Sequence, residues 1–425
     1  MSNPETFLAC NPSYTICLRT ENYYVNLADG RGEDVIKRMR RMIALSPNRP
    51  TYQLLSGHTG KTTELLRLKA ELEQQGFMVI HIAVAQYLQI EDISLCEIWL
   101  VLLKLILCQL EKQVEAIALK SLPDTITELE KCFKLSPPIG IPSYKIRLQN
   151  ILQNLQDFSN QRFKLLNFFE SRLKSSLFAA VEEVITLEVD RLKRSHKKGL
   201  VVLIDNLDQL LVSQADLIFG EGGKYLRQFP CHTVYTFPIV ASDDLKAQLQ
   251  DYSSTLYHLS NLVIRDRQGE INEVSLSLLC QLVLARLLSH LEPEQRLSQV
   301  TEAFDSLNTL HRLCLASYGH LTYLISLLYG CIQRQSLPIA STTVDQVLET
   351  ARVTRIATII DGDWLSLQLA LTGQQLPLDQ SANLMRRLLL FEYHDADGNW
   401  FVSPFSDIVL RGVNKPLMFY KNDPE

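Results

Sequence analysis

The chain has 425 residues, which is long enough for about three domains of ordinary size. Lys and Arg number 42 and Asp and Glu number 47, so the net charge of −5 excludes a general electrostatic attraction to nucleic acid or acidic membranes. Nine cysteines are scattered without CxxC spacing, which argues against a zinc site or a disulfide framework. This cysteine usage is typical of a reducing compartment, so we expect a cytoplasmic protein.

The N-terminal part, residues 1–89, begins without a basic stretch or a long apolar run, so we expect no secretory signal. It contains a strand–loop–helix–strand pattern. Residues 51–56 are a short apolar strand, residues 61–75 a helix that stops at Gly76, and residues 77–84 a second apolar strand. Such a βαβ unit forms a parallel sheet. The sequence therefore predicts an α/β core.

Residues 90–197 are leucine-rich and are predicted to be a helical insertion, broken only at Pro137, Pro138 and Pro142. Its most apolar window, residues 98–110, contains Lys104 and is shorter than the roughly 20 residues of a membrane span. We expect a buried helix there and no membrane span. A long helix over residues 165–194 leads back to the sheet.

The second half of the chain is predicted to complete the sheet and then to become helical. Residues 198–270 contribute strands at 200–204, 232–239 and 256–264. Residues 271–375 form a helical lid, with helices at 275–291, 296–317, 321–335 and 342–358. Residues 376–425 contain a helix at 380–390 and a hairpin at 391–404 around Asp395–Gly398, which predicts a winged-helix-like module.

The stretch Gly57-His-Thr-Gly60-Lys61-Thr62 resembles the end of a phosphate-binding loop. Such a loop wraps phosphate with backbone N–H groups at a helix N-terminus, where its lysine reaches the β and γ oxygens and the next hydroxyl binds magnesium. Here Leu55 stands where the opening glycine belongs, or, counted from Gly57, the loop is two residues short. The competing interpretation is an ordinary turn between strand and helix.

A second motif follows the strand at 200–204, which ends in Asp205-Asn206-Leu207-Asp208. We expect Asp205 to lie at the carboxyl end of a parallel strand next to the strand 51–56, where it would complete a magnesium site with Thr62. Asn206 stands where many ATPases carry a glutamate base, so Asp208 is the nearest carboxylate that could orient water. The alternative is a strand end with turn-forming residues.

Taken together, these motifs resemble a bacterial group of P-loop ATPases of the AAA/STAND kind. The shared segments are Tyr24-Val-Asn-Leu27, Arg31-Gly32, Gly57-His58, Gly60-Lys-Thr-Thr-Glu-Leu65, Asp205-Asn-Leu-Asp208 and Cys231-His-Thr-Val-Tyr-Thr-Phe-Pro238. The resemblance extends more weakly through residues 317–328 and the hairpin around Trp400. It implies a P-loop NTPase core with a helical insertion, a helical lid and a C-terminal winged-helix-like module.

The resemblance also implies residue roles. ATP or ADP would be bound by Gly57, Gly60, Lys61, Thr62 and Thr63, with Mg²⁺ on Thr62 and Asp205. Asp208 would position water and Thr236 would sense the γ-phosphate. Arg227 is either a finger toward a neighbouring nucleotide or a surface side chain. Thr322 stands where the lid pattern has an arginine, which weakens the case for hydrolysis.

Three functions remain open from the sequence. The first is a nucleotide-binding regulatory ATPase or switch, in which ATP binding exceeds efficient hydrolysis. The second is a degenerate pseudo-ATPase that acts as a protein-interaction scaffold, and in either case we expect a protein partner or self-assembly. The third is a winged-helix DNA-binding regulator, but its basic residues Arg386, Arg387, Arg411 and Lys415 are interleaved with Asp395, Asp397 and Asp407, so support for nucleic acid is weak.

Overall fold

The computed structural model describes residues 4–12, 23–90, 93–110, 119–132, 143–157, 171, 173–239, 241–250, 256–266, 269–372, 374, 376–394 and 400–404. The chain divides into two compact units. The sheet unit comprises Val35–Gly57 and Glu64–His258, and the helical unit comprises Met1–Asp34, His58–Thr63 and Leu259–Glu425. Among the described helices, none is long and apolar enough to cross a membrane.

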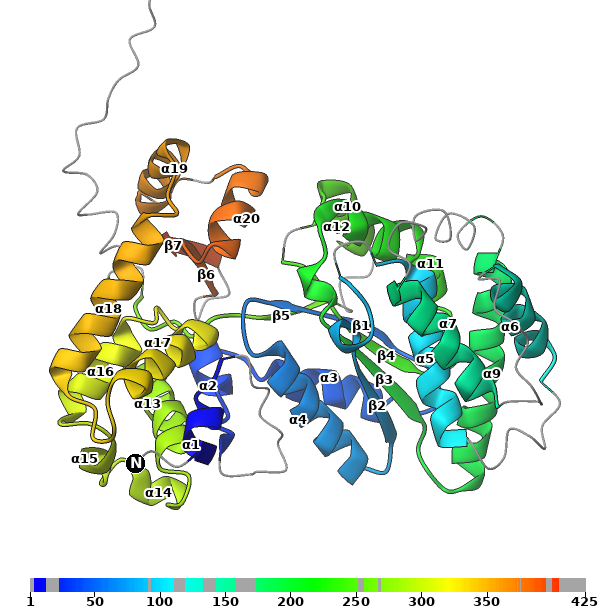
Figure 1. Cartoon of the computed structure of the whole chain (residues 1–425), viewed down its shortest axis with the longest axis horizontal. Coiled ribbons are helices and arrows are strands. Elements are labelled where there is room, and N and C mark those ends of the chain that lie inside the picture. Colours follow the sequence, from blue (N-terminus) through cyan, green and yellow to red (C-terminus); the bar gives the residue numbers. More distant parts are fainter. Residues whose placement is uncertain are drawn as a thin grey trace, which may run out of the picture. The chain divides into compact units, whose positions relative to one another are not determined.

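The sheet unit is built on a five-stranded sheet with the order β2-β3-β4-β1-β5 (Figure 1). Its strands are β1 Tyr52–Gly57, β2 Met78–Ala83, β3 Leu200–Asp205, β4 His232–Thr236 and β5 Leu256–Leu259. β1 pairs with β4, β4 with β3 and β3 with β2, all in parallel. The predicted α/β core with a parallel sheet is confirmed.

The burial of each strand explains why the apolar runs were visible in the sequence. All residues of β1, β3 and β4 are buried, whereas β2 is buried only in part. Central parallel strands are covered on both faces, so β3 is apolar up to its final Asp205, whereas β1 and β4 also bury polar side chains such as Gln53 and Thr233. β2 lies at an edge of the sheet. The predicted strands are confirmed, although β4 ends at Thr236 and β5 at Leu259, so both are shorter than expected.

The predicted neighbourhood of β1 and β3 is wrong, because β4 lies between them. Leu55 of β1 is paired with Thr236, and Ile204 of β3 is paired with Tyr235 of β4. Strand order depends on long-range pairing rather than on the local pattern. The carboxyl end of β3 is therefore adjacent to the carboxyl end of β4, which carries Thr236.

Helices cover the sheet and fill the predicted insertion (Figure 1). The helix α4 Lys61–Gln74 belongs to the sheet unit from Glu64 onward. The other helices of the sheet unit, with its short 3-10 and π turns, are α3 Val35–Ala44, η2 Val84–Gln86, α5 Leu95–Leu110, α6 Ser121–Cys132, α7 Tyr144–Asp157, α9 Lys174–Arg194, η5 Leu207–Gln209, α10 Val212–Ala215, η6 Asp216–Glu221, α11 Gly223–Leu226 and α12 Asp243–Gln250. Gly76, with φ of 91°, follows α4 as predicted.

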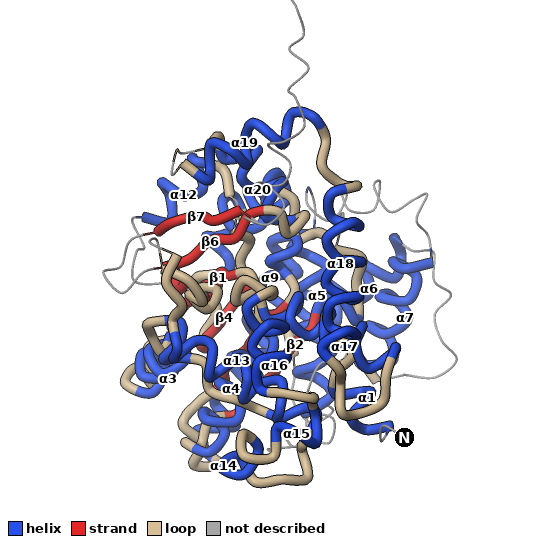
Figure 2. The backbone as a smooth tube through the Cα atoms, turned by 90° about the vertical axis from the view of Figure 1, so that its left-hand side faces the viewer, coloured by secondary structure: helices blue, strands red, loops and turns tan. Residues whose placement is uncertain are grey.

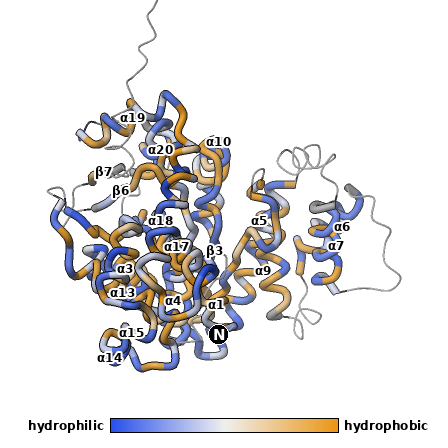
Figure 3. Tube along the Cα trace, turned by 60° about the vertical axis from the view of Figure 1, so that its left-hand side comes forward, coloured by the Kyte–Doolittle hydropathy of each residue, from blue (hydrophilic) through white to orange (hydrophobic). Residues whose placement is uncertain are grey.

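The insertion helices share one hydrophobic core with the sheet. α5 is hydrophobic along most of its length (Figure 3). Its Trp99 is fully buried, and its ring lies 5.4 Å from the ring of Phe178 on α9. The window 98–110 is thus a buried helix, as expected. Pro137, Pro138 and Pro142 lie outside the described residues.

The helical unit contains a second hydrophobic core. Its helices are α1 Pro4–Ala9, α2 Ala28–Arg31, α13 Glu273–Leu287, α14 Pro293–Arg296, α15 Val300–Ala303, α16 Leu307–Leu315, α17 Leu321–Arg334, α18 Ser341–Ile356, α19 Asp361–Leu371 and α20 Leu378–Arg386. The predicted single helix over 296–317 is wrong, because Phe304 is extended and Ser306 begins a new helix by accepting a hydrogen bond from the N–H of Thr309.

A two-stranded antiparallel hairpin follows α20, formed by β6 Leu390–His394 and β7 Trp400–Pro404 (Figure 2). Phe391 and Tyr393 of β6 are buried in the core of the helical unit. The predicted hairpin is confirmed, whereas its turn, Asp395–Gly398, lies outside the described residues. So do residues 405–425, with Asp407, Arg411 and Lys415.

Candidate functional site

The β1–α4 loop, His58–Gly60, connects the end of β1 to the first residue of α4, which is Lys61. Gly57 and Gly60 have φ values of 144° and 83°, a backbone region that side chains disfavour. The two glycines of the motif are therefore required by the turn itself. Three residues separate β1 from α4.

Arg31 packs against this loop from within the helical unit. Its side chain is buried, and Nη2 donates a hydrogen bond to the carbonyl oxygen of Thr59 at 3.3 Å. A Cβ on Gly60 would lie 2.9 Å from the same Nη2 and 3.3 Å from Cδ1 of Leu321. The loop is thus closely packed on one side by a guanidinium and a leucine.

Thr59 carries the observation that most directly indicates a ligand. The residue is 4 % exposed, and its Oγ1 has no hydrogen-bond partner among the described residues. A buried hydroxyl without a partner costs free energy, so such atoms often mark a place where a ligand or water binds. Thr59 directly precedes the glycine that leads into a 14-residue helix, whose N-terminal N–H groups favour anions.

Lys61 is 7 % exposed, and Thr62 and Thr63 are half-buried in the first turn of α4. In the helical unit, the charge of Lys61 acts on His320 at the N-terminus of α17. Burial, followed by His58, Arg355 and Lys61, lowers the pKa of His320 to about 3. His320 is therefore neutral near pH 7, and its Nδ1 accepts a hydrogen bond from the N–H of Tyr323.

In the sheet unit, Asp205 ends β3 and is 1 % exposed. Its Oδ1 accepts the N–H of Asn206 at 2.8 Å, and its Oδ2 lies 3.5 Å from Nε2 of His81 on β2. Asn206 has a left-handed backbone with φ of 74°, which Asn tolerates better than most residues. The strand end is therefore a tight turn that holds a buried carboxylate at the carboxyl edge of the sheet.

Thr236 connects the ends of β4 and β3. Its buried Oγ1 accepts a hydrogen bond from the N–H of Leu207 at 2.9 Å. Leu207 begins the turn that carries the half-buried Asp208. The structure thus brings Asp205, Asp208 and Thr236 to one edge of the sheet unit, and brings Gly60, Lys61, Thr62 and Thr63 into the helical unit.

Two further residues named from the sequence have defined places. The guanidinium of Arg227 lies 5.8 Å from the ring centroid of Tyr52 in the same unit, as an intramolecular cation–π contact. Thr322 is exposed on α17, next to Leu321, which packs on Gly60.

The sequence reasoning missed the contact between His58 and Glu392 of β6. Nε2 of His58 lies 3.4 Å from Oε2 of Glu392, and the two side chains are 6 % and 21 % exposed. His58 and Glu392 are far apart in the chain, and a lone acid in a hairpin gives no local signal of such a pair. His320 and the buried position of Arg31 were missed for the same reason.

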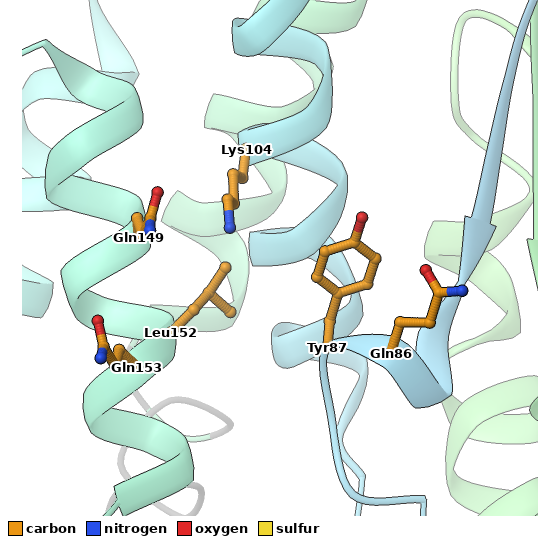
Figure 4. A pocket seen from close by; sticks show the side chains of 6 residues that line it. All are labelled: Gln86, Tyr87, Lys104, Gln149, Leu152 and Gln153. Atoms are coloured by element: carbon orange, nitrogen blue, oxygen red, sulfur yellow. The ribbon is translucent and has the colours of Figure 1, made fainter.

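A separate pocket of about 280 Å³ lies in the sheet unit between η2, α5 and α7 (Figure 4). It is lined by Gln86, Tyr87, Lys104, Gln149, Leu152 and Gln153. The ammonium of Lys104 lies 5.7 Å from the ring centroid of Tyr87. None of the candidate nucleotide residues lines this pocket. Within the described part of the chain, no group of three or more His, Cys, Asp or Glu residues could hold a metal ion by itself.

Among the comparisons with known proteins, only the one with solved structures gives a match. No protein-family model and no curated protein matches the sequence. Among solved structures, the chain is similar to the Aeropyrum pernix ORC1 protein in complex with DNA, with 12% identity, 96% coverage of each chain and a TM-score of 0.36. DNA binding is a property of that protein.

Proposed function

We propose that this chain binds ATP or ADP with Mg²⁺ at the β1–α4 loop and acts as a nucleotide-dependent switch that binds better than it hydrolyses. The observation that carries the proposal is the buried, unpartnered hydroxyl of Thr59 in a glycine-bounded loop at the start of α4. The loop leads directly into Lys61, the first residue of that helix, where phosphate binding is electrostatically favoured.

The proposed roles follow from the chemistry of each side chain. Backbone N–H groups of residues 60–63 would bind phosphate oxygens, and Lys61 would neutralise their charge. Thr62 and Asp205 offer the oxygen ligands that Mg²⁺ prefers, and the bound metal would offset phosphate charge. Asp208 would orient water. Thr236 would position the Asp208 turn through its hydrogen bond with Leu207.

We propose weak hydrolysis because two features of the P-loop ATPases that the sequence resembles are absent: some backbone N–H donors of the loop, and an arginine in the lid. The loop has three residues between β1 and α4, so fewer backbone N–H groups face a phosphate. Thr322 is a neutral hydroxyl where the pattern has an arginine, and arginines in such roles contribute about 10³ or more in rate. The missing arginine reduces transition-state stabilisation more than binding, whereas the missing N–H groups also weaken phosphate binding.

A scaffold without nucleotide is the second candidate, and one observation favours it. Arg31 and Leu321 pack closely on Gly60, as they would in a loop whose only remaining role is structural. In this case the partner would be another protein or a second copy of the chain.

The test measures affinity and turnover separately. Equilibrium binding of ATP and ADP is measured with Mg²⁺ or with EDTA, and phosphate release is followed on the same preparation. A switch predicts saturable, Mg²⁺-dependent binding with little phosphate release. A scaffold predicts neither, and rapid release would contradict the proposed weakness of hydrolysis.

A further inference from the structure

Successive side chains of β6 point in opposite directions and contact two different parts of the helical unit. Phe391 and Tyr393 point into the core of the helical unit, and Glu392, between them, reaches His58 of the β1–α4 loop. This alternation is the ordinary geometry of a strand. One element of the C-terminal hairpin therefore contacts both the helical core and the loop.

β6 is fixed in this position by several contacts within the helical unit. The hydroxyl of Tyr393 donates to the carbonyl oxygen of Tyr318 at 2.7 Å, and the rings of Phe391 and Tyr318 are stacked with centroids 5.6 Å apart. Nδ2 of Asn261 donates to the carbonyl oxygen of Glu392 at 3.1 Å. Glu392 is thus held against the loop by a rigid strand rather than by its own flexible side chain.

The charge of Glu392 opposes the ligand that the loop is proposed to bind. A carboxylate close to a phosphate site repels a polyanion, and the repulsion is strong where side chains are largely buried. The imidazole of His320, which acts electrostatically with His58 and Lys61, is neutral near pH 7 because burial lowers its pKa to about 3. Arg31 and Lys61 supply positive charge on the loop, whereas Glu392 supplies negative charge.

We propose that Glu392 is a positioning residue that holds the β1–α4 loop closed through His58, and that nucleoside triphosphate binds tightly only when the hairpin releases this contact. The inference rests on the proposed nucleotide site and adds its regulation. It makes the C-terminal hairpin an autoinhibitory element of the loop. A partner that pulls the hairpin away from His58 would activate binding.

The test uses the full chain and the variant Glu392→Gln, which removes the charge and keeps the shape. Glu392→Asp keeps the charge but withdraws it from His58. Asp363→Asn is the matched control, because it removes a carboxylate charge near the C-terminal end, from the ion pair with Arg387 at 2.7 Å, without touching the loop. Amide hydrogen exchange of residues 58–62 is measured without nucleotide, and MgATP and MgADP affinities are measured by calorimetry.

Glu392→Gln is expected to speed exchange in residues 58–62 and to tighten MgATP binding by roughly threefold to tenfold, with a smaller gain for MgADP. Glu392→Asp is expected to speed exchange with a smaller gain in affinity, and Asp363→Asn to change neither. If the natural chain binds MgATP and Glu392→Gln leaves affinity and exchange unchanged, the inference is overturned while the proposed function stands. If no chain binds nucleotide, the proposed function fails. If, in addition, amide exchange of residues 58–62 is unchanged in Glu392→Gln, the inference that Glu392 holds the loop closed is overturned as well.

Discussion

The guanidinium of Arg31 lies against Gly60, with Nη2 only 2.9 Å from the position that a Cβ would occupy on that glycine. Gly60 also has φ of 83°, which side chains disfavour. The turn therefore requires glycine both because of this backbone conformation and because Arg31 leaves no space for a Cβ. The backbone of Arg31 is itself held in place, because its carbonyl oxygen accepts a hydrogen bond from the hydroxyl of Ser260 at 3.3 Å. The loop conformation therefore depends on a residue from a distant part of the sequence.

Replacing Gly60 with alanine should displace Arg31 and strain the turn. The left-handed backbone alone costs about 1–2 kcal/mol for a residue with a Cβ. Displacement of the buried guanidinium adds to that cost, and MgATP affinity should fall by about tenfold or more. Urea unfolding and calorimetry measure the two effects.

Gly269→Ala is the control, because Gly269 has a similar φ of 90° and no heavy atom within 4 Å of the added Cβ. It should lose stability through the backbone alone and keep nucleotide affinity. Equal losses of stability in both variants would show that the contact between Arg31 and Gly60 contributes nothing.

Replacing Thr236 with valine should destabilise the sheet unit. The buried N–H of Leu207 loses its acceptor, which costs roughly 1–3 kcal/mol, whereas Thr236→Ser keeps the hydroxyl and loses only a methyl group, about 0.8 kcal/mol. Denaturant unfolding compares the two variants. A serine variant as unstable as the valine variant would contradict the role of this hydrogen bond.

The sequence predicts the strands well because each central strand is short and rich in apolar and β-branched residues, with β3 apolar up to its final Asp205. It also predicts α4, which Gly76 terminates. It cannot predict that β4 separates β1 from β3, since strand order depends on contacts between distant segments. The helix α19 was missed because its apolar residues show little one-sided periodicity.

The candidate site shows the same division between local and distant information. Lys61 and Asp205 were found because each directly follows a recognisable strand or loop. Arg31 and Glu392 reach the loop through tertiary packing, and nothing adjacent to them in sequence indicates this contact. Spacing within a motif reports local geometry and not the residues that pack on it.

Substituting Asp205 and Asp208 should separate metal binding from turnover. Asp205→Asn removes a charged oxygen ligand, so the Mg²⁺-dependent part of ATP affinity should fall by roughly tenfold or more. Asp208→Asn should keep that affinity and lower phosphate release. Titrations with Mg²⁺ and with EDTA measure the metal dependence. An Asp205→Asn chain with undiminished Mg²⁺ dependence would remove Asp205 from the proposed metal site.

Acid should destabilise the fold through buried histidines. Burial lowers the pKa of His320 from 6.5 to about 3 and that of His232 from 6.5 to about 4. Below pH 6.5 the unfolded chain binds protons that the folded chain does not, so the free energy of unfolding decreases as pH falls toward about 3 or 4. Each histidine contributes a slope of up to about 1.4 kcal/mol per pH unit in this window.

The variant His320→Asn tests this prediction, because Asn keeps a helix-capping side chain and removes the titration. It should flatten the pH dependence of urea unfolding below pH 6.5. His290→Asn, at an exposed side chain, should leave the profile unchanged. The account of His320 is wrong if both variants keep the natural slope.

The short β1–α4 loop is proposed to bind phosphate, and calorimetry with MgATP decides whether it does. Three chains are compared: the natural chain, Lys61→Ala, and a variant with a Ser-Gly pair inserted between Thr59 and Gly60. We expect saturable binding to the natural chain and its loss in Lys61→Ala. Absence of binding to the natural chain, with binding gained on insertion, would contradict this expectation and identify a degenerate site.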